Sequence, residues 1–102
     1  MEKRTPHHKL TDVQVEVALR GIDCFTRSAL DGVIAMGLRP AQALAVIQSL
    51  TKEQFYKSMT TYTDHTVWQD VYHATTETCE AYIKFTLRTD GSIVISFKEM
   101  QP

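Results

Sequence analysis

Cysteine is scarce in this chain, which has only Cys24 and Cys79 among its 102 residues. The two could form one disulfide at most, and the reducing conditions of the cytosol disfavour even that bond. There is no C-x-x-C motif, and no histidine lies near either cysteine at the spacing of a zinc site. We therefore expect two free thiols, no bound metal and no cofactor.

Long apolar runs are also missing. The longest, residues 32–38 and 41–47, are far shorter than the roughly 20 residues that a transmembrane helix needs. The first ten residues are polar and lack the apolar core of a secretory signal. These absences predict a cytoplasmic protein that does not enter a membrane.

Neither sign of charge is in excess, because 11 Lys and Arg residues stand against 12 Asp and Glu residues. A uniformly basic surface, the usual sign of a nucleic-acid-binding protein, is excluded, and a site for a polyanion must be a local cluster. The composition is otherwise that of a globular protein, with 43% hydrophobic and 23% charged residues. At this length we expect one domain over residues 1–102.

The few glycines and prolines mark helix ends in the first half of the chain. Gly21 and Gly37 are expected to end helices, Pro40 suits a first helical turn, and Pro6 keeps the N-terminal arm extended. We predict an extended arm over residues 1–10, a helix that is capped by Thr11 and runs to Arg20, and an extended piece over 22–25. A second helix is capped by Thr26 and runs to Met36, and a third covers residues 40–49. A Thr51–Gln54 capping box predicts a fourth helix that ends near Lys57 or Ser58.

Strand patterns replace helix patterns after Met59. Residues 67–73, 79–88 and 92–98 are predicted strands, and residues 89–91 (Thr-Asp-Gly) predict a three-residue hairpin loop between the last two. With helices first and strands after, the chain is predicted to be an α+β protein whose N-terminal helices pack on a C-terminal antiparallel sheet.

The hairpin loop determines which residues of the last two strands stand opposite each other. The expected pairs are Tyr82 with Lys98, Lys84 with Ser96, and Thr86 with Val94. An apolar row of Ile93, Ile95 and Phe97 then faces the helices. The other face carries a phenol, two ammonium groups and hydroxyls, and Val94 is expected to point outward with them. This polar row is either a plain solvated sheet face or a functional one.

The sequence does not decide which side chains of the strand over residues 67–73 face the helices. Alternation places Gln69 and Trp68 on opposite faces, but it does not say which of them shares a face with Tyr82. As a large aromatic residue, Trp68 is expected in the core.

Four segments carry a family resemblance: MEKRTPH at the start, FYKSMTTYTDHTVWQDVY over residues 55–72, AYIKFT over 81–86 and ISFKE over 95–99. With these segments in this order, the chain resembles the MqsR toxins, the motility quorum-sensing regulators of bacterial toxin–antitoxin modules. The match covers almost the whole chain and is densest in the second half.

The resemblance implies a RelE/YoeB-like fold and an mRNA endoribonuclease. Members of that family cut single-stranded mRNA independently of the ribosome and prefer GC-containing triplets. The resemblance also implies a protein partner, a zinc-binding and DNA-binding antitoxin of the MqsA type. DNA would then be contacted only through the antitoxin.

Position by position, the resemblance assigns four active-site residues. The lysine of FYKSM is Lys57, the glutamine of WQDVY is Gln69, the tyrosine of AYIKFT is Tyr82, and the lysine of SFKE is Lys98. For substrate binding we expect Lys84, Arg88, Tyr62 and His65.

These residue types suit RNA cleavage without a metal. In this reaction a base removes the proton of the 2′-OH, and cations stabilise the additional charge of a pentavalent phosphate. An acid then gives a proton to the leaving 5′ oxygen. Lys57 and Lys98 suit the electrostatic clamp on the phosphate, and Gln69 would orient the phosphate or a base edge. A free tyrosine is ionised only about one part in a thousand at pH 7. A facing Lys98 is expected to favour the phenolate of Tyr82. Tyr82 is therefore either the base or a donor to phosphate.

Two other functions fit parts of the pattern. The helices over residues 27–36 and 40–49 could form a helix-turn-helix, although the second has no Arg, Lys or Asn to reach a base edge. Alternatively, the chain is a catalytically silent toxin relative that acts only by binding its antitoxin. The charge bears on this choice, because residues 51–102 hold five Lys and Arg against seven Asp and Glu. Each missing phosphate contact weakens RNA binding.

Overall fold

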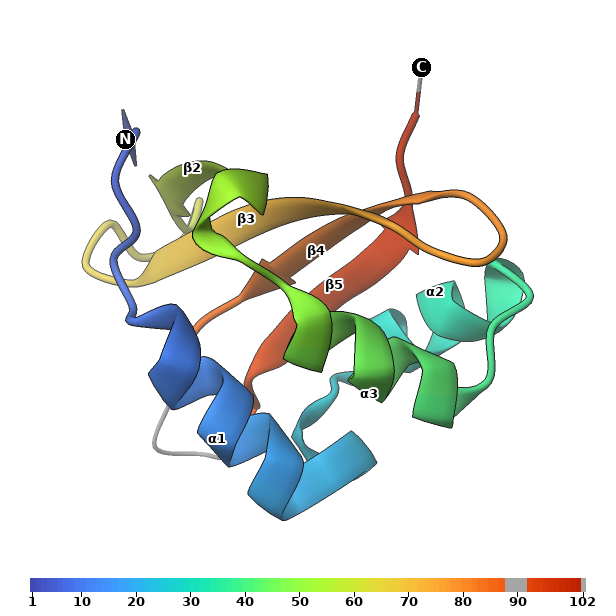
Figure 1. Cartoon of the computed structure of the whole chain (residues 1–102). Coiled ribbons are helices and arrows are strands. Elements are labelled where there is room, and N and C mark those ends of the chain that lie inside the picture. Colours follow the sequence, from blue (N-terminus) through green and yellow to red (C-terminus); the bar gives the residue numbers. More distant parts are fainter. Residues whose placement is uncertain (88–91, 102) are drawn as a thin grey trace.

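Three α-helices cover one face of a five-stranded antiparallel sheet in the computed structural model, which describes residues 1–87 and 92–101 (Figure 1). We call the sheet face against the helices the inner face and the opposite one the outer face. In chain order the elements are β1 (Glu2–Lys3), α1 (Leu10–Arg20), the 3-10 helix η1 (Gly21–Cys24), α2 (Arg27–Ala35), α3 (Pro40–Ser49), the 3-10 helix η2 (Lys52–Gln54), β2 (Phe55–Thr60), β3 (Trp68–Thr75), β4 (Glu80–Phe85) and β5 (Val94–Glu99). The predicted α+β class, with helices first and the antiparallel sheet after, is confirmed.

The starts of α2 and α3 agree with the local sequence signals. The Thr26 hydroxyl accepts the backbone N–H of Ala29 at 3.1 Å, and Pro40 occupies the first turn of α3. The Thr11 cap is wrong, because α1 begins at Leu10 and Lys9 is its capping residue, without a side-chain bond. The extended piece over residues 22–25 is also wrong, since the chain after α1 continues as the 3-10 helix η1.

The fourth helix is the largest error of the sequence analysis. Thr51 and Gln54 do form the predicted box, in which the Thr51 N–H donates to the Gln54 side-chain oxygen at 2.8 Å. The helical part, however, is the single turn η2, and a strand begins at Phe55. Pairing of β2 with β3 on one side and β1 on the other overrides the local helix signal. Lys57 therefore lies in the sheet and not at a helix end.

The strand order is β1-β2-β3-β4-β5, with every neighbouring pair antiparallel. The predicted pairs Tyr82 with Lys98 and Lys84 with Ser96 are confirmed. A bulge then shifts the register, so that Val94 stands opposite Phe85 in place of Thr86. The bulge turns Val94 into the core, contrary to the predicted outward position. The hairpin loop over residues 89–91 lies outside the described residues.

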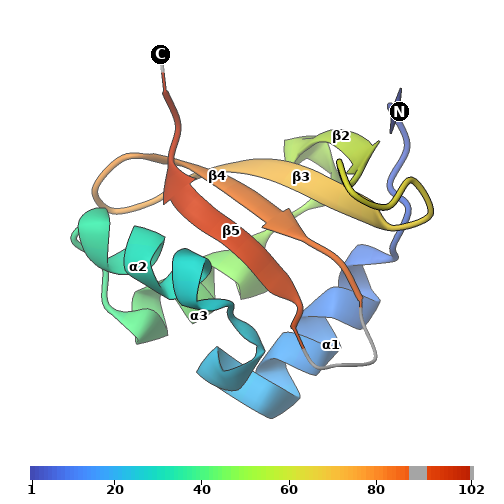
Figure 2. The ribbon, with the colours of Figure 1, turned by 180° about the vertical axis from the view of Figure 1, so that it is seen from behind.

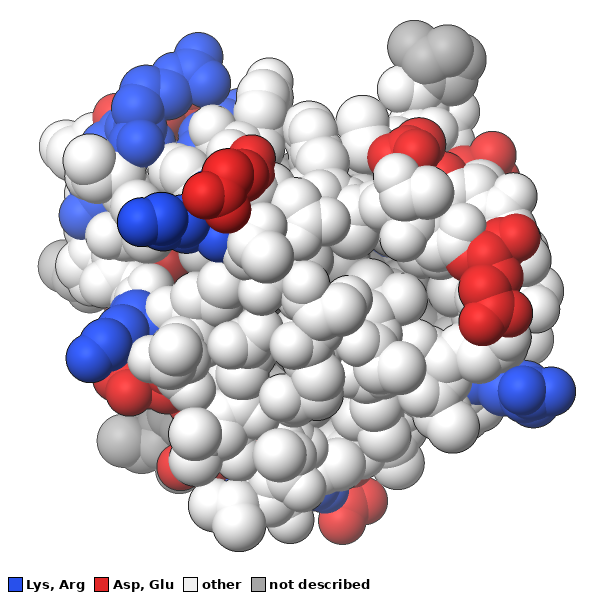
Figure 3. All heavy atoms as spheres, viewed as in Figure 1, with Lys and Arg blue, Asp and Glu red and all other residues white. Residues whose placement is uncertain are grey.

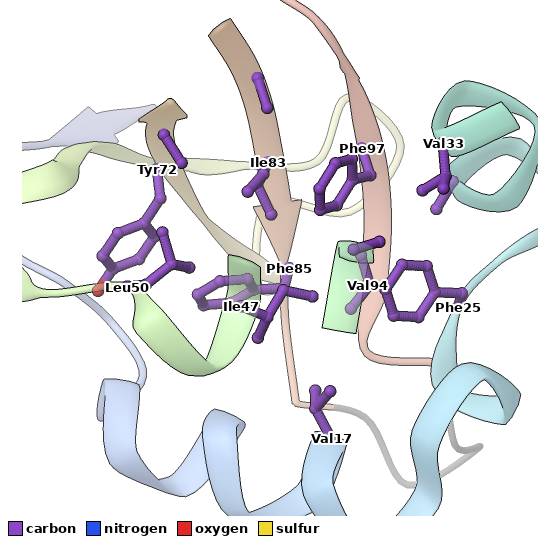
Figure 4. Close-up of a cluster of buried hydrophobic side chains, with 14 of the residues drawn as sticks. Val17, Phe25, Val33, Ile47, Leu50, Tyr72, Ile83, Phe85, Val94 and Phe97 are labelled. Atoms are coloured by element: carbon purple, nitrogen blue, oxygen red, sulfur yellow. The ribbon is translucent and has the colours of Figure 1, made fainter. Parts of the chain in front are cut away.

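The core fills the space between the helices and the inner face (Figure 4). Phe85, Tyr72 and Phe97 contribute the largest fully buried side chains of the sheet, and Ile47 of α3 meets them from the helical side. Helix α2 lies directly on β5 (Figure 2). A Cβ atom added at Gly32 of α2 would lie 2.0 Å from the Phe97 carbonyl oxygen, so only glycine permits this approach.

The N-terminal arm is bound to the edge of the sheet through β1. The α-ammonium of Met1 donates to the Thr60 hydroxyl at 3.1 Å. The buried carboxylate of Asp70 accepts the backbone N–H groups of His7 and His8 at 3.0 and 2.8 Å and the Ser58 hydroxyl at 2.7 Å. These bonds fix the arm against β2 and β3.

The arm also corrects the placement of Trp68. Its indole is half-buried and is no member of the core, because it lies at the first position of β3. The His7 ring stacks on it with centroids 5.5 Å apart, and the Lys3 ammonium lies 4.2 Å from the centroid of the ring. Arm residues cover this aromatic side chain.

The two cysteines are both free, Cys24 buried and Cys79 half-buried. Among the residues that the structure describes, no single helix is long and apolar enough to cross a membrane. The pair α2 and α3 passes that test only jointly and is bent by 101°.

Candidate active site

Three aromatic rings from three strands form a row on the outer face, which we call the aromatic stripe: Tyr56 of β2, His73 of β3 and Tyr82 of β4. The rings of Tyr56 and His73 stack with centroids 4.3 Å apart and planes 25° apart. His73 stands directly opposite Tyr82 across the strands, with ring centroids 6.0 Å apart. Lys98 of β5 continues the row, with its ammonium 5.4 Å from the centroid of the Tyr82 ring.

Two more cations border the stripe at its other end. The guanidinium of Arg4 lies 5.7 Å from the centroid of the Tyr56 ring, and the ammonium of Lys57 lies 5.5 Å from it. Beside the stripe is a hollow of about 450 Å³, which we call the first hollow. Its lining residues are Tyr56, His73, Tyr82, Lys98, Glu99, Met100 and Gln101. Rings and cations around an open hollow suit the bases and phosphates of a single-stranded nucleic acid.

Lys57 has a partner that the sequence analysis missed. Its ammonium donates to the Glu2 carboxylate at 2.6 Å, and only 20% of the Lys57 side chain is exposed. The hydrogen bond to Glu2 raises the pKa of Lys57, and the bond to Lys57 likewise lowers the pKa of Glu2. Lys57 is thus charged at neutral pH, and its ammonium is paired with the carboxylate of Glu2 in β1.

Tyr82 keeps its proton at neutral pH. Its phenol is half-buried, and burial raises its pKa above the ordinary value, although the charge of Lys57 partly opposes the shift. The expectation that Lys98 favours the phenolate is therefore wrong. Burial outweighs the cations, and the cation that lowers the pKa of Tyr82 is Lys57.

Gln69 lies on the outer face but away from the stripe. It is four residues along β3 from His73, which corresponds to about 13 Å of strand. Its side chain is 6% exposed and lines a second hollow of about 540 Å³. The other lining residues of this second hollow are Met1, Glu2, Met59, Thr60, Thr61, Tyr62, His65 and Lys84. The structure places Lys98 beside Tyr82, and Lys57, at the other end of the stripe, acts on Tyr82 through its charge. Gln69 lies farther along the sheet from Tyr82.

The residues expected to bind substrate gather at the second hollow. Lys84 is half-buried, and burial together with the charge of Lys98 lowers its pKa. Tyr62 is 99% exposed, and His65 is exposed in the same turn between β2 and β3. Arg88 lies outside the described residues.

Comparisons with known proteins identify the family of this chain. The family model described as "Motility quorum-sensing regulator, toxin of MqsA" matches residues 5–99. The chain belongs to the MqsR toxin family. The curated protein "mRNA interferase toxin MqsR" of Escherichia coli (strain K12) is 46% identical over 99 residues, which cover 97% of this chain and 99% of that relative. The resemblance noted from the four segments is confirmed.

Two features of this MqsR family member escaped the sequence analysis because they depend on pairing between distant segments. Glu2 reaches Lys57 only because β1 pairs with β2, and His73 joins the stripe only because of the register of β3 on β4. Alternation could have found His73, since it shares the face of Gln69 in the same strand.

Charge is unevenly distributed over the molecule. In the view of Figure 3, Lys and Arg side chains gather where the N-terminal arm and β2 lie, and Asp and Glu gather toward the C-terminal end. Within the described residues, no group of three or more His, Cys, Asp or Glu side chains could hold a metal ion. The local cationic cluster that a polyanion needs is present at the stripe despite the net charge of −1.

Proposed function

We propose that the outer face of the sheet is the active site of this mRNA interferase toxin, and that it cuts single-stranded mRNA without a metal ion. The observation that carries the proposal is the phenol of Tyr82 beside two ammonium groups, Lys98 at 5.4 Å from its ring and Lys57, whose charge acts on its pKa. The substrate class includes GC-containing triplets, cut independently of the ribosome, and one domain over residues 1–102 carries the activity.

The chemistry needs charge stabilisation above all. The 2′ oxygen attacks the adjacent phosphorus, and the pentavalent phosphate carries an additional negative charge until the 5′ oxygen leaves. Lys98 of β5, directly beside Tyr82, and Lys57 of β2, which approaches from the other end of the stripe, stabilise that charge. Tyr82, which retains its proton, donates to the phosphate or to the leaving oxygen. The products are a 2′,3′-cyclic phosphate and a 5′-hydroxyl.

Substrate binding uses both hollows. Bases of a single strand stack on the aromatic stripe, for which ring faces next to cations are well suited. Gln69 is too far from Tyr82 to contact the same phosphate, so it orients a neighbouring nucleotide together with Lys84. Tyr62 and His65 line the rim of the second hollow, where that nucleotide lies.

The partner is an antitoxin of the MqsA type, a zinc-binding and DNA-binding protein. The description of the matching family, which names MqsA, supports this partner. DNA is contacted only through the antitoxin, and the toxin acts in the cytoplasm, where its message substrate is.

The test is cleavage of a labelled single-stranded RNA with GC-containing triplets by the purified protein, with and without EDTA. We expect cleavage to be the same in EDTA. Tyr82→Phe should cut at least tenfold more slowly with an unchanged melting curve, because it removes only one hydroxyl from the outer face. Cleavage that is lost in EDTA and restored by a divalent ion would refute the metal-free scheme.

A second candidate function is supported by the Glu2–Lys57 ion pair. With the carboxylate 2.6 Å from the ammonium, one of the two phosphate-binding lysines is occupied. A toxin relative that only binds its antitoxin, as a partner or co-regulator of transcription, would show this arrangement. Formation of a stable antitoxin complex by a protein that cuts none of the RNAs tested would favour it.

A further inference from the structure

His73 lies at the centre of the aromatic stripe. It stacks on Tyr56 at 4.3 Å on one side and stands opposite Tyr82 at 6.0 Å on the other. The half-buried imidazole also lines the first hollow, where Tyr82 and Lys98 would meet the phosphate. It is thus the one histidine of the described residues that shares a hollow with the proposed catalytic phenol.

The ring of His73 is positioned but not engaged in hydrogen bonding. Stacking against Tyr56 sets the plane of the imidazole. Neither ring nitrogen makes a hydrogen bond to another residue within 1–87 or 92–101, in contrast to His8, whose Nε2 atom lies 3.0 Å from the Thr86 hydroxyl. A neutral imidazole has one nitrogen that accepts a proton, and that of His73 is available to a ligand in the first hollow.

Among the described residues, the other groups that border the aromatic stripe offer no free proton acceptor next to Tyr82. Tyr82 is protonated at neutral pH, as a free tyrosine is, and its burial raises the pKa further; lysine ammonium groups carry no free lone pair. The Glu2 carboxylate is already bonded to Lys57. Glu99 also lines the hollow, but it is exposed and stands opposite Ala81, whereas His73 stands directly opposite Tyr82.

We propose that His73 is the general base of the cleavage reaction; the inference rests on the proposed function and assigns the proton transfers within it. The imidazole nitrogen takes the proton of the 2′-OH as the 2′ oxygen bonds to phosphorus. The bond from phosphorus to the 5′ oxygen breaks, and the Tyr82 phenol gives its proton to that oxygen. A proton then passes from the His73 imidazolium through water to the Tyr82 phenolate, which restores both groups.

The pH dependence of cleavage can identify the base. An imidazole changes its charge between about pH 5 and 8. The charged or titratable groups around His73 come from every neighbouring element: Glu2 and Arg4 of the arm, Tyr56 and Lys57 of β2, Tyr82 and Lys84 of β4, and Lys98 and Glu99 of β5. Tyrosine, lysine and arginine side chains ordinarily titrate above that range, and carboxylates ordinarily titrate below it. An increase in rate across pH 5–8 would therefore report the imidazole.

The experiment measures single-turnover cleavage at saturating protein from pH 5 to 9 for the wild type and three variants. His73→Phe keeps an aromatic ring for stacking but has no proton acceptor. We expect it to bind an RNA with a 2′-deoxy cleavage site about as well as the wild type. It should cut the normal RNA about a hundredfold more slowly, the scale of one lost general base, and lose the increase with pH.

Two further variants separate proton transfer from structure. His73→Ala should regain part of its rate when free imidazole is added, since the first hollow is open to it. His7→Asn removes an imidazole from outside the hollow, where His7 stacks on Trp68, and should keep the wild-type rate and pH profile. Thermal melting of each variant confirms that it is folded.

The outcomes are distinct. If His73→Phe cuts at close to the wild-type rate, or keeps the increase with pH, His73 is not the base. If its loss is explained by weaker binding of the 2′-deoxy RNA, the residue serves only stacking, and the proposal also fails. A wild-type protein that cuts no RNA would refute the proposed function itself, before a variant is made.

Discussion

Tyr72 and Tyr82 stand on neighbouring strands and on opposite faces of the same sheet. On the inner face, Tyr72 is 0% exposed, stacks on Phe85 at 5.1 Å, and has its pKa raised to about 12 by burial and then by the charge of Asp70. On the outer face, Tyr82 is half-buried, and the charge of Lys57 opposes the effect of burial on its pKa. One residue type has become a core side chain on one face and a candidate proton donor on the other.

The two tyrosines differ first in burial and then in the charged groups beside them. The carboxylate of Asp70, the one buried charged residue among those that the structure describes, is stabilised by hydrogen bonds from N–H groups of the arm and from Ser58. The cations of the outer face lie instead beside open hollows, where a phosphate can reach them. The hydrogen bonds of Asp70 therefore maintain the fold, and the cations of the outer face remain available for a ligand.

The largest effect should come from removing a cation of the outer face. Lys98→Ala and Lys57→Ala should each slow RNA cleavage by roughly two to three orders of magnitude, the scale for loss of one preorganised charge donor. Single-turnover cleavage with thermal melting checks this. Lys52→Ala removes an exposed lysine of η2 and should change neither quantity. Equal rates in all three variants would place the active site elsewhere.

Asp70→Ala should give the next largest effect, on the fold. It removes the acceptor of the His7 and His8 N–H groups and of the Ser58 hydroxyl. Bonds to a buried charge are worth about 1.5–3 kcal/mol, so we expect the free energy of unfolding to fall by about 3 kcal/mol. Urea denaturation measures it.

The matched control for Asp70 is Asp31→Ala. Asp31 forms an exposed ion pair with Arg27 at 3.5 Å, which contributes little to stability. A similar loss of stability in both variants would mean that the arm is not held by Asp70.

Some features of this fold could be predicted from the sequence and others could not. The first residues of α2 and α3 follow from Thr26 and Pro40, because a capping residue or a proline acts on its own helical turn. Alternation with a short loop similarly predicted that Tyr82 faces Lys98. The strand state of Phe55–Thr60 was not predictable in this way, because it depends on pairing with β1 and β3.

The residues of the candidate site also differ in whether the sequence could identify them. Lys57, Gln69, Tyr82 and Lys98 were found through the family resemblance, which also chose the face of Gln69. Glu2 and His73 were missed, since each joins the site through the register of strands far apart in the chain. The bulge at Phe85 was missed because nothing local marks it, and it buries Val94.

Tyr72→Phe should have a smaller and stabilising effect. The Tyr72 hydroxyl is buried and has no hydrogen-bond partner within the described residues. An unsatisfied buried polar group costs about 1–3 kcal/mol, so its removal should raise the free energy of unfolding by about 1 kcal/mol at pH 7. Urea denaturation against Tyr62→Phe, which alters an exposed phenol, is the measurement.

The same variant should change the response to alkaline pH. The pKa of Tyr72 is raised to about 12 in the folded protein, whereas an unfolded tyrosine titrates near 10. Between about pH 10 and 12 the unfolded chain loses this proton and the folded one keeps it, so stability falls as pH rises. Tyr72→Phe removes that contribution, and its stability should fall less steeply above pH 10. Equal slopes would show that the phenol is not protected from ionisation.

The smallest effect should come from Glu2→Gln, which tests whether the Glu2 carboxylate weakens RNA binding by occupying Lys57. Without that charge, Lys57 is free for a phosphate, and we expect a non-cleavable RNA to bind about two- to fivefold more tightly, as suits an ion pair whose carboxylate side is exposed. Measured from 50 to 300 mM salt, the wild-type slope of log K against log salt should be roughly −2 to −3, and the variant steeper by about 0.7, which corresponds to one more phosphate contact. Asp31→Asn removes the same charge from α2 and should leave the slope unchanged. If Glu2→Gln also leaves it unchanged, Lys57 does not contact the RNA backbone, and its role is to bind β1 to the sheet.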